Sequence, residues 1–250
     1  MLILGIDFET TSPDAVSARP IEVAVILWDE SWNEQGRFST LMKAHNHDSL
    51  SEEIVRITGI TDAMLDESAI PNDNAFRQLN EWMEKADAFL AHNAQYDQTV
   101  YERESERLGF IPWQKPWYCS ILDVAHPDKI SCRKLSHMAL DYGRAIDPAT
   151  LHRAMADVEL IGHALRANGV TPTQIKEYAE APWVYMKACI PAPWEDNGRG
   201  KELAKKDGYS WETPRGSTEP KFPKTWVKRV KQSQLEAEKL RSVGFKREAL

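Results

Sequence analysis

Residues 2–11 read LILGIDFETT, and the alternation of side chains in this stretch decides the fold. The even positions from Leu2 to Phe8 are all apolar, whereas the odd positions change from apolar to acidic at Asp7 and Glu9. Because successive side chains of a strand point to opposite faces, the stretch predicts a central strand that is buried on both faces at its start. Both acids then project from one face of the sheet.

The segments that follow predict a mixed α/β sheet flanked by helices, because an antiparallel meander of strands is followed by strands that alternate with helices. The strands are expected at residues 2–8, 21–28, 37–42 and 88–91, and the helices at residues 72–86, 93–108, 135–142, 150–168 and 172 to about 187.

Length and composition favour one main domain with a small appendage. The 250 residues, 42% of them hydrophobic and 28% charged, suffice for one sizeable core. No apolar run approaches the roughly 20 residues of a membrane-spanning helix. The short apolar stretch at the start of the sequence is not preceded by the basic residues of a signal peptide, so we expect a cytoplasmic protein. Three widely spaced cysteines, Cys119, Cys132 and Cys189, argue against disulfides and a structural zinc site.

The net charge of −7 is unevenly distributed along the chain. Residues 199–250 contain 14 Lys and Arg against 7 Asp and Glu, whereas residues 1–198 contain 17 against 31. An acidic body that concentrates carboxylates for cations, with a basic tail that attracts phosphates, would give this distribution. A solvated surface with uneven charge and no partner would give it equally well.

The acids Asp7 and Glu9 form the first candidate site. At about 4 Å and an effective dielectric constant near 20, two carboxylates repel each other by about 4 kcal/mol, so a positive partner is expected between them. Mg²⁺ or Mn²⁺ is the simplest partner, because these cations prefer carboxylate oxygens. The alternative is a strand that ends before Asp7, which would leave both acids in solvent.

Two later segments carry the other candidate residues. Asn93 and Asp97 lie where an apolar strand turns into a helix, although Asn93 could be a plain N-cap and Asp97 an acid that complements the helix dipole. His152 and Asp157 are about 140° apart around one helix, so both reach one site only if His152 lies at or before the helix start. Taken alone, His152 could be an exposed turn residue.

Together, these clusters resemble the DEDDh family of 3′→5′ exonucleases over about residues 1–170. The matching motifs are Asp7-Phe8-Glu9-Thr10-Thr11, His92-Asn93-Ala94 with Asp97, and His152 followed five residues later by Asp157. The segment Arg56-Ile57-Thr58-Gly59-Ile60-Thr61 with Met64 is similar to the family's stretch between the third strand and the next helix. The resemblance, which extends to polymerase proofreading subunits and exodeoxyribonuclease X, implies an RNase-H-like α/β fold with a mixed five-stranded sheet.

The resemblance also implies a role for each residue. Two cations, Mg²⁺ or Mn²⁺, would be held by Asp7, Glu9, Asp97 and Asp157, with Asp97 acting through water. His152 would be the general base, because an imidazole titrates near neutrality while the carboxylates stay bound to metal. The terminal nucleotide would be held by Thr10, Ile57, Thr58, Asn93 and Tyr96. Two of these, Ile57 and Tyr96, could equally be core residues.

The end of the chain predicts a separate small α+β module. Pro191, Pro193 and Gly198 mark a linker, so we expect an exonuclease domain at residues 1–188 and a linker with a basic module at 189–250. Its expected elements are a helix at 201–206, a strand at 224–230 and a helix at 234–243. Trp211 and Trp226 stand among lysines, as in surfaces for single strands, although they could instead form the core of the module. The module is also a candidate contact for a replication or repair protein.

The sequence therefore predicts a metal-dependent 3′→5′ exonuclease that releases nucleoside monophosphates from single-stranded or frayed DNA. The choice of DNA follows from the resemblance alone, because no feature of the sequence reads a 2′ hydroxyl. The alternatives are a 3′→5′ exoribonuclease and a non-catalytic, nucleic-acid-binding accessory subunit. The presence of all five catalytic residue types counts against the accessory subunit, because a binding module gains nothing from clustered carboxylates.

Overall fold

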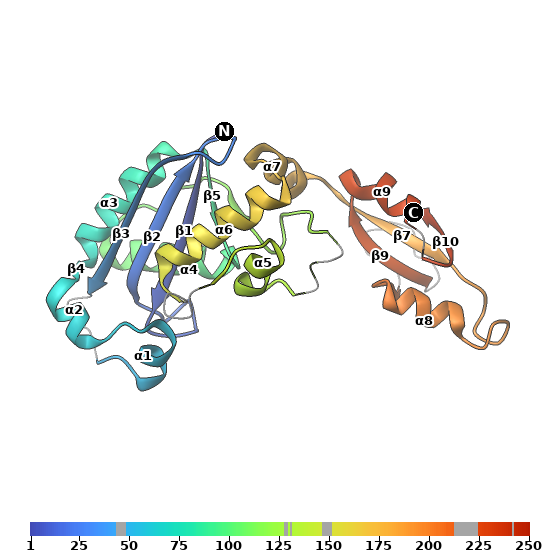
Figure 1. Ribbon diagram of the computed structural model, residues 1–250, viewed down its shortest axis with the longest axis horizontal. Coiled ribbons are helices and arrows are strands. Elements are labelled where there is room, and N and C mark those ends of the chain that lie inside the picture. The colour runs from blue at the N-terminus through green and yellow to red at the C-terminus, as the bar shows by residue number, and fades with distance from the viewer. Residues whose placement is uncertain (44–48, 128–129, 131, 147–151, 213–224, 242) are drawn as a thin grey trace. The chain divides into compact units, whose positions relative to one another are not determined.

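The computed structural model describes residues 1–43, 49–127, 130, 132–146, 152–212, 225–241 and 243–250. The chain forms two compact units, Met1–Ala179 and Glu180–Leu250 (Figure 1). Among the described residues, no helix combines the length and the apolar character that crossing a membrane requires.

The first unit is built on a mixed sheet with the strand order β4-β3-β2-β1-β5-β6. The strands are β1 (Ile3–Thr10), β2 (Pro20–Trp28), β3 (Glu34–Lys43), β4 (Ile70–Pro71), β5 (Ala88–Ala91) and β6 (Trp117–Cys119). Strands β1, β2 and β3 pair antiparallel, which confirms the predicted meander, whereas β5 and β6 extend the sheet in parallel. The expected mixed α/β sheet is confirmed, and the two-residue strand β4 adds a sixth strand at one edge.

Helices cover both faces of this sheet. They are α1 (Glu52–Thr58), α2 (Asp62–Ser68), α3 (Asn72–Lys85), α4 (Ala94–Leu108), α5 (Leu135–Asp141), α6 (Ala154–Asn168) and α7 (Pro172–Glu180). Figure 1 shows α6 in front of the sheet, with α3 and α4 behind it. The central strand β1 is therefore enclosed between two helical layers.

The alternation in β1 explains these two layers. Leu4 and Ile6 belong to the core cluster that contains Phe76 of α3, whereas Ile3 belongs to the cluster that contains Val158 of α6. Asp7 and Glu9 continue the face that Ile3 begins, so they lie on the side of the sheet that α6 covers. The alternation that buries β1 on both faces therefore also places its two acids under α6.

A close contact brings α6 down onto this face. Gly5 lies between Asp7 and Ile3 on the same side of β1, and a Cβ there would stand 2.4 Å from the ring of Trp28. A Cβ added to Gly162 of α6 would lie 2.5 Å from the same ring. The missing side chains therefore leave room for the indole between strand and helix, and they allow α6 to approach β1 closely.

The second unit is an antiparallel sheet with the strand order β10-β7-β9-β8. Its elements are β7 (Trp183–Cys189), α8 (Arg199–Lys206), β8 (Ser210–Glu212), β9 (Thr225–Lys231), a 3₁₀ turn (Gln232–Gln234), α9 (Leu235–Leu240) and β10 (Lys246–Ala249). A small core of Met186, Ala188, Ala204, Tyr209 and Val230 holds it together. The α+β character expected for the end of the chain is therefore present.

The predicted helix from residue 172 to about 187 is wrong at its end. Helix α7 stops at Glu180, and residues 183–189 form strand β7 of the second unit. Pro182 explains the break, because proline lacks an N–H group and disfavours a helical residue before it. The two compact units divide after Ala179, and the domain boundary at residue 188 stays a prediction.

Two predicted ends cannot be compared with the structure directly. Helix α6 begins at Ala154, whereas the predicted start at Thr150 lies outside the described residues, as does Lys224 at the start of the strand predicted for 224–230. The helix predicted at 234–243 is shorter in the structure and ends at Leu240.

Candidate active site

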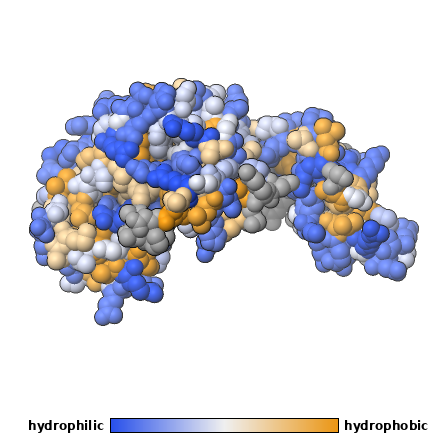
Figure 2. All heavy atoms as spheres, viewed as in Figure 1, coloured by the Kyte–Doolittle hydropathy of each residue, from blue (hydrophilic) through white to orange (hydrophobic). Residues whose placement is uncertain are grey.

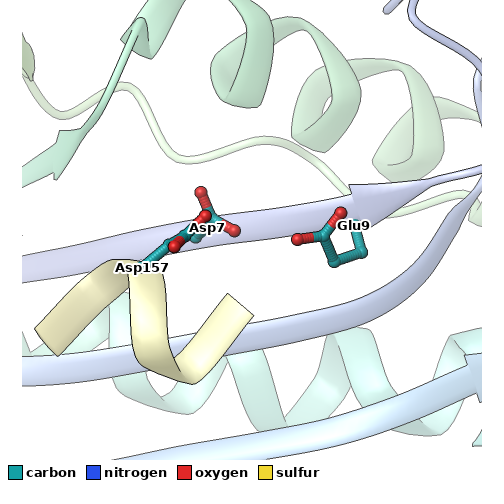
Figure 3. Close-up of side chains that lie close together, drawn as sticks. All are labelled: Asp7, Glu9 and Asp157. Carbon is teal, nitrogen blue, oxygen red and sulfur yellow. The ribbon is translucent and has the colours of Figure 1, made fainter. Parts of the chain in front are cut away.

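Three carboxylates from two elements meet at the face of β1 that α6 covers. Asp7 and Glu9 come from the strand, and Asp157 comes from the first turn of the helix. One oxygen of each lies within 4.8 Å of the others. Figure 3 shows the three side chains gathered between β1 and the start of α6. The sequence placed Asp7 and Glu9 on one face, and the structure brings Asp157 to that face.

A buried glutamate holds the start of α6 against the sheet. Glu22 of β2 lies beside Glu9 in the strand pairing and is only 3% exposed. Its carboxylate accepts hydrogen bonds from Arg153 (Nη2 to Oε1, 2.6 Å) and from the backbone N–H of Ala154 (3.1 Å). The first N–H groups of a helix have no partner within the helix. The carboxylate of Glu22, which belongs to β2, therefore caps the N-terminus of α6.

The sequence analysis missed Glu22 and Arg153 as site residues. A signal for Glu22 was present, because a single charged residue inside the apolar stretch Ile21–Trp28 requires a partner when the strand is buried. Arg153 directly follows His152, but the motif contains only His152 and Asp157, so Arg153 was not considered. Together the two residues position the segment that carries both His152 and Asp157.

His152 lies two residues before Ala154, the first residue of α6, so it meets the condition that the sequence set for it to share a site with Asp157. Its backbone is in the left-handed region, with φ of 58°, and its side chain is exposed. Burial raises the pKa of Asp157 to about 6, and the charge of His152 opposes that rise. The imidazole is therefore close enough to the carboxylates to interact with them electrostatically while remaining open to solvent.

Asp97 lies next to this group but does not join it directly. It is in the first turn of α4, is 3% exposed, and accepts a hydrogen bond at Oδ1 from the backbone N–H of Phe8 (3.2 Å). Burial raises its pKa to about 8. Since Phe8 stands between Asp7 and Glu9, this bond holds Asp97 against the backbone of β1 between the two acids.

Asn93 links β5 to α4, and its backbone is also left-handed, with φ of 67°. The residue occupies the N-cap position of α4, but its side chain is exposed and makes no capping hydrogen bond. Asn93 is therefore the N-cap residue of α4, as the sequence suggested, but it caps the helix without a side-chain hydrogen bond. Its amide is left available at the surface near Asp97.

The carboxylates carry more negative charge than their surroundings neutralise. Burial, then the charge of Asp157 and other acids, raises the pKa of Glu9 to about 9, and burial with the neighbouring acids raises the pKa of Asp7 well above its usual range. Arg153 lowers the pKa of Glu9 only in part, because its guanidinium is already paired with Glu22. This donor set fits a divalent cation, which would supply the missing positive charge through oxygen ligands.

Two of the residues expected to hold a nucleotide lie together beside the acids. The hydroxyl of Tyr96 is 2.5 Å from Oγ1 of Thr10, and both groups hydrogen-bond to the carbonyl oxygen of Ser12. Thr10 is buried and Tyr96 is half-buried. Each therefore holds the other in place at the end of β1.

Two more of the expected residues, Ile57 and Thr58, belong to α1 and differ in their exposure to solvent. Ile57 is 41% exposed, and Figure 2 shows apolar residues gathered on the visible surface over α1 and α2. Thr58 is buried, and its hydroxyl donates to the carbonyl of Ile54 (2.9 Å) and accepts from the N–H of Ile60 (3.1 Å). The side chain of Thr58 is thus used within its own turn.

A family model described as Exonuclease (RNase_T) matches residues 4–165. The chain belongs to this exonuclease family. The exonuclease-family region contains all four acids of the site as well as His152, and it lies within the first unit.

Curated relatives include the PolC-type DNA polymerase III of Bacillus cereus, which is 30% identical over 168 residues, corresponding to 64% of this chain and 11% of the polymerase. The PolC-type enzyme of Staphylococcus haemolyticus is 33% identical over 157 residues, or 61% of this chain and 10% of the polymerase. This exonuclease-family chain thus spans about a tenth of the length of these relatives.

Solved structures support the fold. Exonuclease I of E. coli in complex with a dA13 oligonucleotide has a TM-score of 0.60 and 15% identity, covering 92% of this chain and 63% of that one. Exonuclease I of Methylocaldum szegediense has a TM-score of 0.60 and 17% identity, covering 92% and 62%. The likeness confirms the RNase-H-like architecture that the resemblance implied.

Proposed function

We propose that this protein is a 3′→5′ exodeoxyribonuclease that uses divalent cations, Mg²⁺ or Mn²⁺, to release nucleoside monophosphates from the 3′ end of single-stranded or frayed DNA. The observation that carries the proposal is the convergence of Asp7, Glu9 and Asp157, whose oxygens lie within 4.8 Å of one another on a partly buried face. Membership in the exonuclease family supplies the reaction class.

Carboxylates in this arrangement suit two cations. Asp7, Glu9 and Asp157 would hold one ion directly, and Asp7 with Asp97 would hold a second, in agreement with the position of Asp97 outside the three-carboxylate group. Bound cations would act as Lewis acids: they would lower the pKa of a bound water molecule and stabilise negative charge on the departing 3′ oxygen. Their positive charge would also lower the pKa values of the carboxyl groups that burial raises.

His152 is the residue in this site that we assign to proton transfer. An exposed imidazole before α6 can accept a proton from water and pass it to solvent, while the four acids remain committed to cations. The bond network of Glu22, Arg153 and the Ala154 N–H would keep the histidine backbone in place during this step.

The terminal nucleotide would lie near the linked side chains of Thr10 and Tyr96, with Ile57 and Asn93 offering exposed contacts. Thr58 would contribute through its backbone or its packing, because its hydroxyl is engaged. The choice of DNA rests on the relatives, which are named as DNA polymerases, and on the structures of exonuclease I with DNA oligonucleotides.

The test compares 5′-labelled single-stranded DNA with RNA of the same sequence in Mg²⁺, Mn²⁺ or EDTA. We expect a ladder that shortens from the 3′ end, is faster on DNA, and disappears in EDTA and in Asp157→Ala. The matched control is Asp141→Ala, which removes an exposed carboxylate outside the site and should retain full activity.

Three outcomes would contradict parts of the proposal. Faster cleavage of RNA would make the protein an exoribonuclease, and shortening from the 5′ end would reverse the direction. Absence of cleavage with either cation and either polymer would favour a non-catalytic nucleic-acid-binding subunit.

A further inference from the structure

The second unit contains an apolar hollow that the proposed reaction does not use. It has a volume of about 910 Å³ and lies between α8, the loop at 190–194 and the ends of β7, β8 and β9. This size is within the roughly 300–1,000 Å³ typical of ligand sites. The described residues that line it all belong to the unit Glu180–Leu250.

Three tryptophans line this hollow. Trp211 of β8 and Trp226 of β9 are cross-strand partners with ring centroids 5.7 Å apart, and Trp194 comes from the loop. Trp194 is 83% exposed and Trp211 is 55% exposed. Of these three tryptophans, Trp226 packs against the small core. A role in the core therefore accounts for Trp226 but not for the exposed rings of Trp194 and Trp211.

Three lysines line the same hollow. Lys201 and Lys205 are four residues apart on α8, which places them on one side of the helix, and Lys187 comes from β7. No acidic residue is present among the described residues that line the hollow. Lys187 and Lys205 have carboxylate partners, Glu248 and Glu202, but these pairs are exposed and therefore weak enough to exchange for another anion.

We propose that this hollow binds single-stranded DNA, with bases stacked on Trp194 and Trp211 and phosphates held by Lys201 and Lys205. Exposed aromatic rings beside a row of cations are the combination that unpaired strands require, because every base offers a flat face and every nucleotide a phosphate. An apolar protein segment would match the rings but not the lysines. The choice of DNA over RNA rests on the proposed function, and the unit would keep a strand attached while its 3′ end is processed.

The test measures binding of a 5′-fluorescein-labelled dT20 to the full chain by fluorescence anisotropy in EDTA, where no cleavage is expected. We expect about tenfold weaker binding for Trp211→Ala and for Lys205→Glu. The logarithmic salt dependence should also become shallower for Lys205→Glu, by about one phosphate contact. Trp211→Phe keeps a ring and should retain most of the affinity, which separates stacking from a folding defect.

The chain offers a matched control for each change. Lys206→Glu makes the same charge change on the same helix at a position that does not line the hollow. Trp183→Ala removes a tryptophan of similar exposure, 47%, whose ring is already covered by Arg229 and Lys231. Both controls should bind within about twofold of the unchanged protein. Equal losses in Lys205→Glu and Lys206→Glu would show general charge attraction and overturn the proposal.

A second readout separates this inference from the proposed exonuclease activity. Hydrolysis of the p-nitrophenyl ester of thymidine 5′-monophosphate with Mn²⁺ needs only the first unit, so Trp211→Ala and Lys205→Glu should hydrolyse it at the unchanged rate. If the unchanged protein hydrolyses no substrate but these variants still lose dT20 binding, the proposed function fails and the inference stands. Unchanged dT20 binding in both variants overturns the inference, whatever the activity.

Discussion

Replacing Asp97 with asparagine should stabilise the metal-free protein and destroy its activity. The carboxylate of Asp97 is buried, and burial raises its pKa from 3.8 to about 8. Asparagine has the same shape and can still accept the hydrogen bond from the Phe8 N–H at its carbonyl oxygen. The substitution therefore removes the cost of ionisation while it keeps the packing.

The pH dependence follows from the sign of the shift. A carboxyl group with a raised pKa binds its proton more tightly in the folded state, so it lowers stability as pH increases from the unfolded value near 4 to the folded value near 8. The difference between these two pKa values corresponds to about 5 kcal/mol at pH 8. Neighbouring acids hold protons in the same range and share this cost, so we expect a gain of roughly 2–5 kcal/mol, or roughly 5–15 °C in melting temperature.

Calorimetry in EDTA at pH 5 and pH 8 measures the effect, which should be small at pH 5 and large at pH 8. The matched control is Asp73→Asn in the first turn of α3, where the carboxylate is partly exposed and pairs with Arg77. That change should lower stability by about 0.3–1 kcal/mol, similarly at both pH values. An Asp97→Asn protein that is less stable than the unchanged protein at pH 8 in EDTA would refute the reasoning.

Three further predictions concern the surroundings of the site. Glu22→Gln should lower turnover by about 10–100-fold because it loosens the start of α6, whereas Glu34→Gln at the surface should leave turnover unchanged; steady-state kinetics measures both. Gly5→Ala should destabilise the protein by about 1–3 kcal/mol in urea unfolding, because its Cβ would overlap the Trp28 ring. Glu104→Ala should cost about 3 kcal/mol in the same assay, because it leaves two arginines without their fully buried partner.

Much of the site could be predicted because it follows from local periodicity. The change from apolar to acidic residues in β1 identified the face on which Asp7 and Glu9 lie, and helix geometry required His152 to precede its helix. Both inferences need only the regular spacing of side chains within one element. The family motifs then connected elements that are far apart in the sequence.

The residues that were missed depend on contacts between elements. Glu22 caps α6 because β2 pairs with β1 in a register that places Glu22 beside Glu9, and because α6 crosses the sheet at that point. Neither fact is present in the local pattern of β2. Strand β7 was mistaken for helix for the same reason, since its partners β9 and β10 lie at the end of the chain.

The arrangement couples the activity of this protein to a cost in its own stability. Asp7, Glu9 and Asp97 are held near one another by β1 and α4, which contribute Ile6 and Tyr101 to the buried core, so the acids cannot separate without disrupting that core. Substitutions that relieve their repulsion should therefore stabilise the fold and remove the cation ligands at the same time. Cation binding should stabilise the unchanged protein most at alkaline pH, where the empty site is most strained, and this gain should shrink in Asp97→Asn.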